Sequence, residues 1–144
     1  MTIYTIGFTK TSAEAFFTRL QSAPIKSLVD VRLNNVSQLA GFTKKDDLKY
    51  FLRIICSISY EHRPELAPKP ELLDAYRRRL ITWTDYENAF LELMKERRIQ
   101  TLIPRSLIDG SCLLCSEASA DRCHRRLVAE YLASEWGNVD IVHL

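Results

Sequence analysis

The segment Ser111–Arg126, SCLLCSEASADRCHRR, constrains the fold of this chain more than any other stretch. It opens with the apolar run Cys112–Cys115, which is short enough for a buried strand, and then becomes small and polar. Apolar residues at helical spacing return from about Asp121. In open α/β folds, ligands bind where a strand ends beside the start of a helix, and free backbone N–H groups there favour an anion or a thiolate. The segment therefore predicts an α/β fold with a functional site at this junction.

The remainder of the chain alternates strand-like and helix-like segments. Short apolar runs rich in β-branched residues predict strands at Ile3–Ile6, Ile25–Val31, Ile58–Tyr60, Cys112–Cys115 and Val139–Val142. A strand–helix–strand unit usually forms a parallel pair with a right-handed crossover. We therefore expect residues 1–144 to form a single three-layer, Rossmann-like α/β domain, with helices on both faces of a mostly parallel sheet of four to five strands.

The boundaries of the helices are predicted from local patterns. Capping boxes predict one helix start at Thr11, with Glu14, and another at Thr84, with Glu87. The stretch between the second of these helices and Ser111 is irregular, and a short strand is predicted there at Thr101–Ile103.

Composition and charge set broad limits on function. The 144-residue chain is 47% hydrophobic, as expected of a globular protein that is long enough to bury a core. It has four cysteines, and its amino terminus has neither a basic region nor a long apolar stretch, which predicts a protein of the reducing cytoplasm without a membrane partner. Arginine clusters at Arg77–Arg79, Arg97–Arg98 and Arg122–Arg126 fit either solvated helix faces or, if they share one surface, a nucleic-acid-binding face.

Polar residues follow four of the predicted strands. They are Gly7 after the first strand, Asp30 and Arg32 after the second, Tyr60 and His62 after the third, and Cys115 and Glu117 after the fourth. The carboxyl ends of parallel strands lie at one edge of a sheet. The sequence therefore predicts one cleft lined by these groups, beside a helix start that carries Cys123, His124 and Arg125.

Three residues of this cleft are candidate catalytic groups: Cys115, Glu117 and His124. Cys115 fits a thiolate stabilised by the helix start and by Arg125, or a small core residue. Glu117 fits a general acid or base, a partner of Arg32, or a plain loop carboxylate. His124 fits a proton-transfer group or a packed, hydrogen-bonded histidine.

Four residues are candidate substrate-binding groups: Gly7, Asp30, Arg32 and Arg125. Gly7 permits a turn or a close ligand approach that a side chain would block. Arg32 and Arg125 would hold an anion such as a phosphate. Asp30 would orient Arg32, or the two would simply form an ion pair.

The cysteines raise two further possibilities. Cys112, Cys115, Cys123 and His124 match the count of a Cys3His zinc site. Alternation along a strand argues against that site, because Cys112 and Cys115 would face opposite sides, and no metal site is predicted. A reversible Cys115–Cys123 redox pair is the better alternative, since the two cysteines flank one short loop.

Several segments resemble the prokaryotic domain-of-unknown-function family 488. They are IYTIGFT (Ile3–Thr9), LVDVR (Leu28–Arg32), YEHRPELAP (Tyr60–Pro68) and LLCSEASADRCHRRLVAEYL (Leu113–Leu132). The resemblance implies a compact α/β fold and no established activity. It marks as motif positions Gly7, Asp30, Arg32, Cys115, Glu117, Cys123, His124 and Arg125.

The chain departs from the family pattern at two places. Residues Ile99–Gly110 form a longer and more irregular stretch than the family leads us to expect. Within the polar loop Asn34–Thr43, the pair Asn34-Asn35 stands where a proline is common.

Three functions are consistent with these residues. The first is an enzyme that acts on a phosphate-bearing substrate, such as a nucleotide or a nucleic acid. The second is a non-catalytic module that binds a nucleotide or nucleic acid. The third is a thiol-redox protein that uses Cys115 and Cys123. The sequence gives no basis for naming a cofactor, a substrate or an oligomeric state.

Overall fold

The computed structural model describes residues 1–36 and 40–144, so three residues of the predicted loop Asn34–Thr43 lie outside the described residues. Five parallel strands form one sheet in the order β3-β2-β4-β1-β5, which confirms the predicted α/β fold. The strands are β1 (Thr2–Ile6), β2 (Ser27–Asp30), β3 (Ser59–His62), β4 (Ser111–Leu114) and β5 (Asp140–His143). The α-helices are α1 (Ala13–Gln21), α2 (Lys45–Phe51), α3 (Pro70–Arg77), α4 (Trp83–Arg97), α5 (Ile99–Leu102), α6 (Arg105–Ile108) and α7 (His124–Trp136). Shorter helical turns are η1 (Gly41–Thr43), η2 (Leu52–Cys56) and η3 (Pro64–Leu66).

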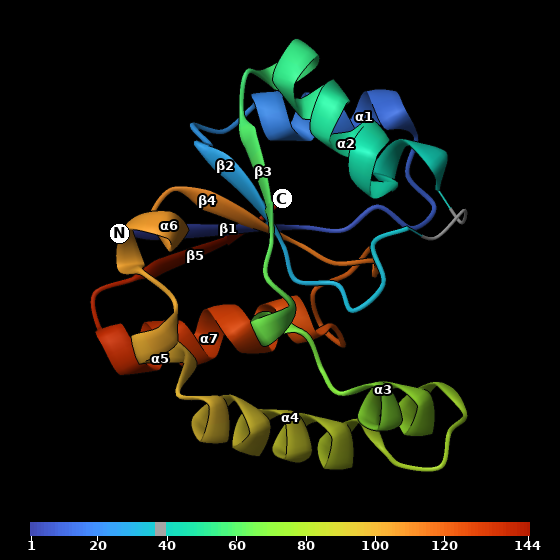
Figure 1. The fold of residues 1–144 in the computed structure, drawn as a ribbon, viewed down its shortest axis with the longest axis vertical. Coiled ribbons are helices and arrows are strands. Elements are labelled where there is room, and N and C mark those ends of the chain that lie inside the picture. The colour runs from blue at the N-terminus through green and yellow to red at the C-terminus, as the bar shows by residue number, and fades with distance from the viewer. Residues whose placement is uncertain (37–39) are drawn as a thin grey trace.

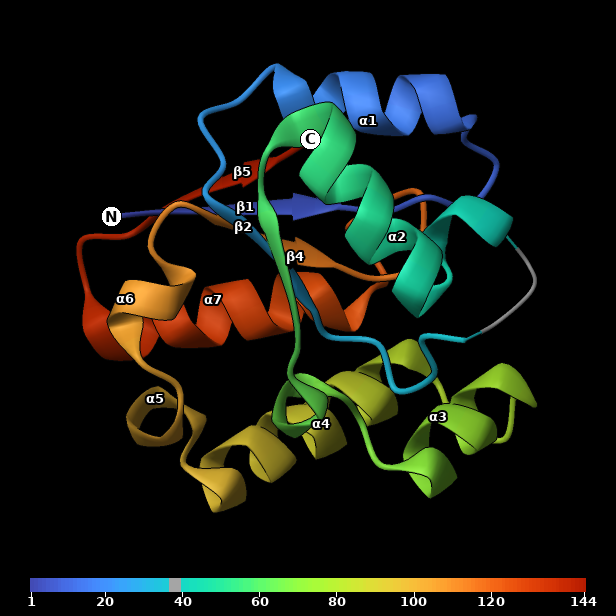
Figure 2. The same ribbon diagram turned by 45° about the horizontal axis from the view of Figure 1, so that its top comes forward.

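The helices cover both faces of the sheet, which gives the three expected layers (Figure 1). Helices α1 and α2 lie on one face, and α7 lies against the other. Figures 1 and 2 both show α3 and α4 farther from the sheet than α7, on the same side.

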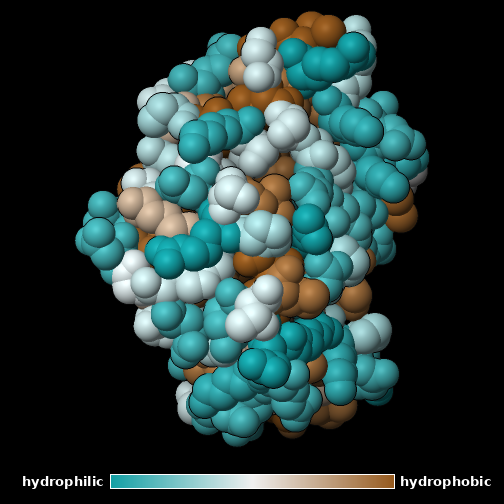
Figure 3. Space-filling view, turned by 60° about the vertical axis from the view of Figure 1, so that its left-hand side comes forward, coloured by the Kyte–Doolittle hydropathy of each residue, from teal (hydrophilic) through white to brown (hydrophobic). Residues whose placement is uncertain are grey.

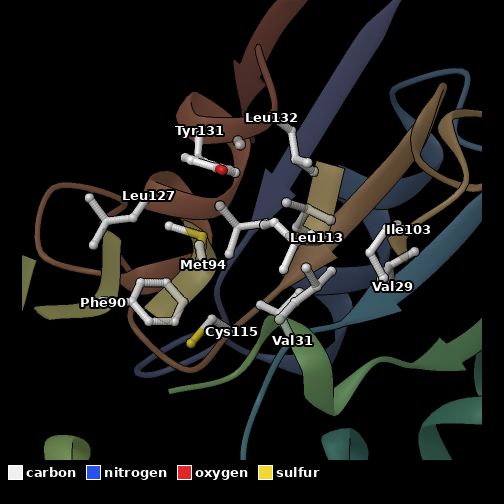
Figure 4. Close-up of a cluster of buried hydrophobic side chains, with 14 of the residues drawn as sticks. Val29, Val31, Phe90, Met94, Ile103, Leu113, Cys115, Leu127, Tyr131 and Leu132 are labelled. Atoms are coloured by element: carbon white, nitrogen blue, oxygen red, sulfur yellow. The ribbon is translucent and has the colours of Figure 1, made fainter. Parts of the chain in front are cut away.

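The core consists of two groups of buried side chains, one on each face of the sheet. The central strands β2 and β4 are buried at every position, as expected of parallel strands covered on both faces. Alternation along β4 sends Cys112 and Leu114 to the α1–α2 side, and Leu113 to the α7 side. Cys115 follows on the α7 side, and Figure 4 shows it among the labelled side chains of that group.

Two predicted helix starts are wrong in detail. Helix α1 is capped by Ser12, not Thr11, because the Ser12 hydroxyl accepts a hydrogen bond from the Ala15 N–H at 3.1 Å. Helix α4 begins two residues before the predicted position, with Thr82 and Asp85 forming the capping box. In both cases a neighbouring residue of the same chemical type provides the cap.

The segment before β4 also differs from its prediction. The strand predicted at Thr101–Ile103 is wrong, because residues 99–102 form the helical turn α5. Ile99 and Ile103 are both buried, and helical spacing places residues four apart on the same face. Helix α7 also starts later than the predicted Asp121, at His124, with Cys123 at its N-cap position.

Among the described residues, no helix is both long and apolar enough to cross a membrane. Figure 3 shows a face on which hydrophilic side chains predominate and hydrophobic ones form separate groups.

Candidate functional site

The end of β2 carries a buried ion pair. Asp30 is fully buried and Arg32 is 3% exposed. The Arg32 Nε donates to Asp30 Oδ1 at 2.9 Å, and Nη2 donates to Asp30 Oδ2 at 2.8 Å and to the Thr43 carbonyl at 2.7 Å. This bidentate geometry fixes the plane of the guanidinium group. Asp30 and Arg32 therefore form an ion pair, which is common to both predictions for these residues.

Two residues of β3, Tyr60 and His62, form hydrogen bonds that support the Asp30–Arg32 pair. The Tyr60 hydroxyl donates to Asp30 Oδ2 at 2.6 Å, and Asn35 Nδ2 donates to the Tyr60 oxygen at 3.2 Å. Burial and the charge on Asp30 raise the pKa of Tyr60, so its phenol stays protonated. His62 Nε2 donates to the Arg32 carbonyl at 2.8 Å. Tyr60 and His62 thus support the site, whereas the sequence predicted that they line the cleft.

The junction of β4 and α7 brings Cys115 and His124 into contact. The Cys115 Sγ lies 3.4 Å from His124 Nδ1, and both side chains are buried. His124 Nε2 lies 2.6 Å from the Val31 carbonyl oxygen, which only accepts hydrogen bonds, so Nε2 carries a proton. Nε2 is also 3.7 Å from the sulfur, but its proton is used by Val31. At 3.4 and 3.7 Å from the two ring nitrogens, the sulfur lies over the face of the imidazole and not along the in-plane Nδ1 lone pair.

The buried cysteines Cys112, Cys115 and Cys123 differ in thiol pKa because their surroundings differ. Burial raises the pKa of Cys115, but the Cys123 thiol, the Ser116 N–H and the charge on Arg125 outweigh burial, and its pKa is lowered below the ordinary 9.0. Burial and the neighbouring Cys115 raise the pKa of Cys123. Burial also raises the pKa of Cys112, which lies on the opposite face of the sheet. Cys115 is thus the cysteine of this site that is favoured to ionise.

Gly7 and Arg125 hold the loop after β4 in place. Arg125 is 1% exposed, and its Nη1 donates to the Glu117 carbonyl at 2.6 Å. Its Nη2 donates to the Ala118 carbonyl and its Nε to the Thr5 hydroxyl, each at 3.4 Å. A Cβ at Gly7 would lie 1.6 Å from the Glu117 carbonyl oxygen. Gly7 is therefore required for the close approach of the protein's own loop, and Arg125 is occupied by that loop.

A cavity of about 290 Å³ opens beside this junction. Five of the predicted site residues line it: Arg32, Cys115, Glu117, Cys123 and His124. Its other walls come from Leu33, Asn34, Leu73, Tyr76, Arg77, Trp83, Tyr86, Ser116 and Arg122. Asp30, Gly7 and Arg125 lie behind these walls.

Helices α3 and α4 contribute an aromatic wall that sequence reasoning missed. The ring centroids of Tyr76 and Trp83 are 5.6 Å apart, and Trp83 stacks on Tyr86 at 5.2 Å. Tyr86 is buried, whereas Tyr76 and Trp83 are half-buried and present ring surface to the cavity. The signal in the sequence was three aromatic residues within eleven positions, beside the Arg77–Arg79 cluster.

Positive charge surrounds the same cavity. Arg77 and Arg122 line it and are exposed. Within residues 1–36 and 40–144, Arg32 Nη1 has no hydrogen-bond acceptor, while Nε and Nη2 are used. The first turn of α7 has no acidic residue and no side-chain cap, so its N–H groups add to the positive potential. Three arginines (Arg32, Arg77 and Arg122) and one carboxylate (Glu117) thus line the cavity.

Comparison with known proteins identifies the family. Residues 12–132 match the family described as "Domain of unknown function DUF488". The chain belongs to the DUF488 family. A search of curated proteins and a search of solved structures each gave no match.

The DUF488 match confirms the resemblance drawn from the sequence motifs. It includes the Asp30–Arg32 pair, the aromatic residues of α3 and α4, and the whole segment from Cys115 to Arg125. Gly7 precedes the matched residues. The DUF488 description assigns no activity.

Proposed function

We propose that this protein is an enzyme that acts on a phosphate-bearing substrate with a planar ring, namely a nucleotide or a nucleotide of single-stranded nucleic acid. One observation carries the proposal. The Cys115–His124 contact lies at a cavity whose walls also present aromatic rings and arginine side chains. Each of these three elements has a matching part in such a substrate.

The aromatic wall suits the base of the substrate. Tyr76 and Trp83 are half-buried and keep part of their ring surface accessible. Stacking of a base on an aromatic side chain contributes about 1–3 kcal/mol and tolerates different bases. This wall supports recognition of a planar ring without selecting a particular base.

The arginines suit the phosphate. Arg77 and Arg122 line the cavity with exposed guanidinium groups, and Arg32 lies beside them with Nη1 unused by the described residues. Guanidinium groups bind phosphate oxygens in a bidentate manner. Asp30 keeps Arg32 in a fixed orientation, so this arginine is prepared for the ligand before it arrives.

The reactive groups are those at the β4–α7 junction. Cys115 and His124 are in contact, and Glu117 lines the same cavity from an exposed loop. A carboxylate at that place is suited to move a proton to or from the substrate. In this proposal Cys115 and His124 are the reactive groups, and Glu117 transfers a proton to or from the substrate.

Ligand-dependent thermal unfolding tests the substrate class. The reduced protein is screened with inorganic phosphate, nucleosides, nucleoside monophosphates and short single-stranded oligonucleotides. A ligand at 100 times its dissociation constant should stabilise the protein by about 2.7 kcal/mol. We expect nucleotides to stabilise more than nucleosides or phosphate alone.

Matched variants locate the binding site. Trp83→Leu and Arg77→Ala should reduce the ligand-induced stabilisation. Trp136→Leu and Arg78→Ala should not, because neither of these residues lines the cavity. Equal stabilisation in all four variants would place the ligand elsewhere, and no stabilisation by any nucleotide would refute the proposal.

Turnover separates an enzyme from a binding module. Products of the stabilising ligand are sought by mass spectrometry with wild-type protein, Glu117→Gln and Cys115→Ser. The proposal expects slower turnover with Glu117→Gln and none with Cys115→Ser, while ligand-induced stabilisation persists in both. Binding with no conversion by the wild-type protein would favour the non-catalytic alternative.

A further inference from the structure

Three side chains of types that can ligate a metal meet in the wall of the cavity. The ligand atoms of Cys115, Cys123 and His124 all lie within 4.8 Å of one another. All three side chains are buried, with exposures of 5%, 2% and 6%. Metal-ligand bonds of about 2.3 Å to sulfur and 2.0–2.1 Å to nitrogen place tetrahedral S and N ligands about 3.6 Å apart. The observed distance from Cys115 Sγ to His124 Nδ1 is 3.4 Å.

We propose that Cys115, Cys123 and His124 bind a zinc ion whose fourth coordination position faces the cavity. All three residues line that cavity, so the open position is accessible to a ligand. Three protein ligands with one open position are characteristic of catalytic zinc sites, whereas structural sites use four. Thiolate and imidazole donors favour zinc over magnesium or calcium, which prefer oxygen ligands.

The surroundings of His124 match those of a metal-binding histidine. Such a histidine usually donates its second ring N–H to a carboxylate or a backbone carbonyl, which fixes the tautomer and the ring orientation. His124 Nε2 makes this bond to the Val31 carbonyl at 2.6 Å, which leaves Nδ1 of a neutral ring without a proton. The Cys115 sulfur lies over the ring face, so a rotation of the ring would direct Nδ1 to the shared metal.

Charge balance also supports a zinc ion at this place. Burying isolated thiolates would be costly, because burial disfavours a charged group. Two thiolates, one neutral imidazole and Zn²⁺ form a cluster with no net charge. A zinc ion therefore allows both buried cysteines to ionise together.

Strand alternation, which argues against a Cys3His zinc site, does not exclude a site formed by Cys115, Cys123 and His124. Cys112 and Cys115 do face opposite sides of the sheet, so a site with Cys112 as a ligand cannot form. That alternation excludes only Cys112, because Cys123 precedes α7 and lies on the same side as Cys115. The set that converges is Cys2His rather than Cys3His.

The metal site rests on the proposed function only for its reaction, which would be hydrolysis. Zinc lowers the pKa of a bound water to about 7. Glu117 would accept the proton, and the hydroxide would form a bond to the electrophilic atom of the substrate. The bond to the leaving group would then break, and the leaving group would take up the proton from Glu117. Substrate and water are the reactants, so no oxidant or reductant is required.

Metal analysis of the reduced protein tests the site. Protein purified without chelators is analysed for zinc, and the metal-free protein is titrated with Zn²⁺ and Co²⁺. We expect one zinc per chain, and a Co²⁺ adduct with thiolate-to-cobalt charge-transfer absorption and tetrahedral visible bands. Cys115→Ser and Cys123→Ser should each lose stoichiometric zinc and weaken the charge-transfer band.

Control variants keep this test specific. Cys56→Ser and Cys112→Ala should retain zinc and the full cobalt spectrum, because neither residue belongs to the cluster. Circular dichroism confirms that each variant is folded, and His124→Asn provides a third ligand variant if one serine variant does not fold. Stoichiometric zinc in folded Cys115→Ser or Cys123→Ser would overturn the proposal.

Two further outcomes are decisive. Reduced wild-type protein that binds no zinc, but forms a Cys115–Cys123 disulfide on mild oxidation, would replace the zinc site with the redox pair. Nucleotide stabilisation without zinc binding would refute the metal site and leave the proposed substrate class intact. Zinc binding without nucleotide stabilisation would support the metal site and refute the proposed substrate class.

Discussion

At the scale of single residues, the candidate site depends on a few buried contacts behind the cavity wall. Gly7 allows the loop after β4 to approach β1, and Arg125 binds the carbonyl groups of that loop. Asp30 orients Arg32 and is itself held by Tyr60. Substitutions of Gly7, Asp30, Tyr60 or Arg125 should therefore alter the site, although none of these four residues lines the cavity.

Gly7→Ala should destabilise the protein and disturb ligand binding. Its Cβ would overlap the Glu117 carbonyl oxygen at 1.6 Å, so the loop must move. Overpacking of this kind costs about 1–3 kcal/mol, which denaturant unfolding measures. Gly41→Ala is the control, because a Cβ there meets no atom of residues 1–36 or 40–144 within 4 Å. Equal stability of the two variants would contradict the close approach of the loop.

Tyr60→Phe should lower stability by about 1.5–3 kcal/mol, since the hydroxyl donates to a charged carboxylate. The difference should shrink as the pH rises above about 10, the pKa of tyrosine in an unfolded chain. The folded state raises the pKa of Tyr60, so above that pH the unfolded wild-type chain releases a proton that the folded chain retains. Urea unfolding at several pH values measures both effects. Tyr50→Phe, at an exposed tyrosine, should have little effect at any pH.

At the scale of elements, the start of α4 determines where its aromatic residues point. The capping box of Thr82 and Asp85 begins the helix directly before Trp83. Trp83 and Tyr86 are three residues apart, so they lie on one face of the helix and build the cavity wall together. The predicted start at Thr84 would leave Trp83 outside the helix. The observed start at Thr82 therefore affects the cavity wall as well as the helix boundary.

Thr82→Ala should cost about 1 kcal/mol of stability, because it removes the hydroxyl that accepts from the Asp85 N–H. Thr84→Ala should have a much smaller effect, since Thr84 is exposed within the first turn. Thermal and urea unfolding of the two variants compare the positions directly. A larger loss from Thr84→Ala would favour the capping box predicted from the sequence.

At the scale of the whole molecule, the sheet is covered on both faces, while α3 lies beside α4 and away from the sheet (Figure 2). Helix α3 has no fully buried residue, although it provides Tyr76 and Arg77 to the cavity. Segments with little buried surface open at low free-energy cost. We therefore expect α3, which forms part of the cavity wall, to open more readily than the other elements around the cavity.

Hydrogen exchange should show this difference. Amides of α3 should exchange faster than those of α7, which buries seven of its residues. A stabilising nucleotide should slow exchange in α3, because Tyr76 and Arg77 would contact it. Mass spectrometry of peptides from α3 and α7, with and without ligand, measures both effects. Protection of α3 equal to that of α7 in the free protein would contradict the prediction.

The sequence by itself determined the parallel α/β sheet and the edge at which the polar residues gather. These features follow from local patterns: apolar runs form the strands, and polar residues such as Arg32 and Glu117 come after them. The same local patterns identified Cys115 and His124, because strand, loop and helix are contiguous there. They placed helix starts less well, since serine and threonine residues near a helix start compete for the cap position.

Only the tertiary structure decided what each polar residue faces. Arg125 lies in the same motif as His124, yet it binds the protein's own loop, because packing against β1 fixes its direction. Tyr76 and Trp83 reach the cavity from helices that the sequence leaves unplaced relative to the sheet. The convergence of Cys115, Cys123 and His124 likewise depends on where the loop turns into α7. Distances between side chains are set by the packing of whole elements, which local periodicity does not encode.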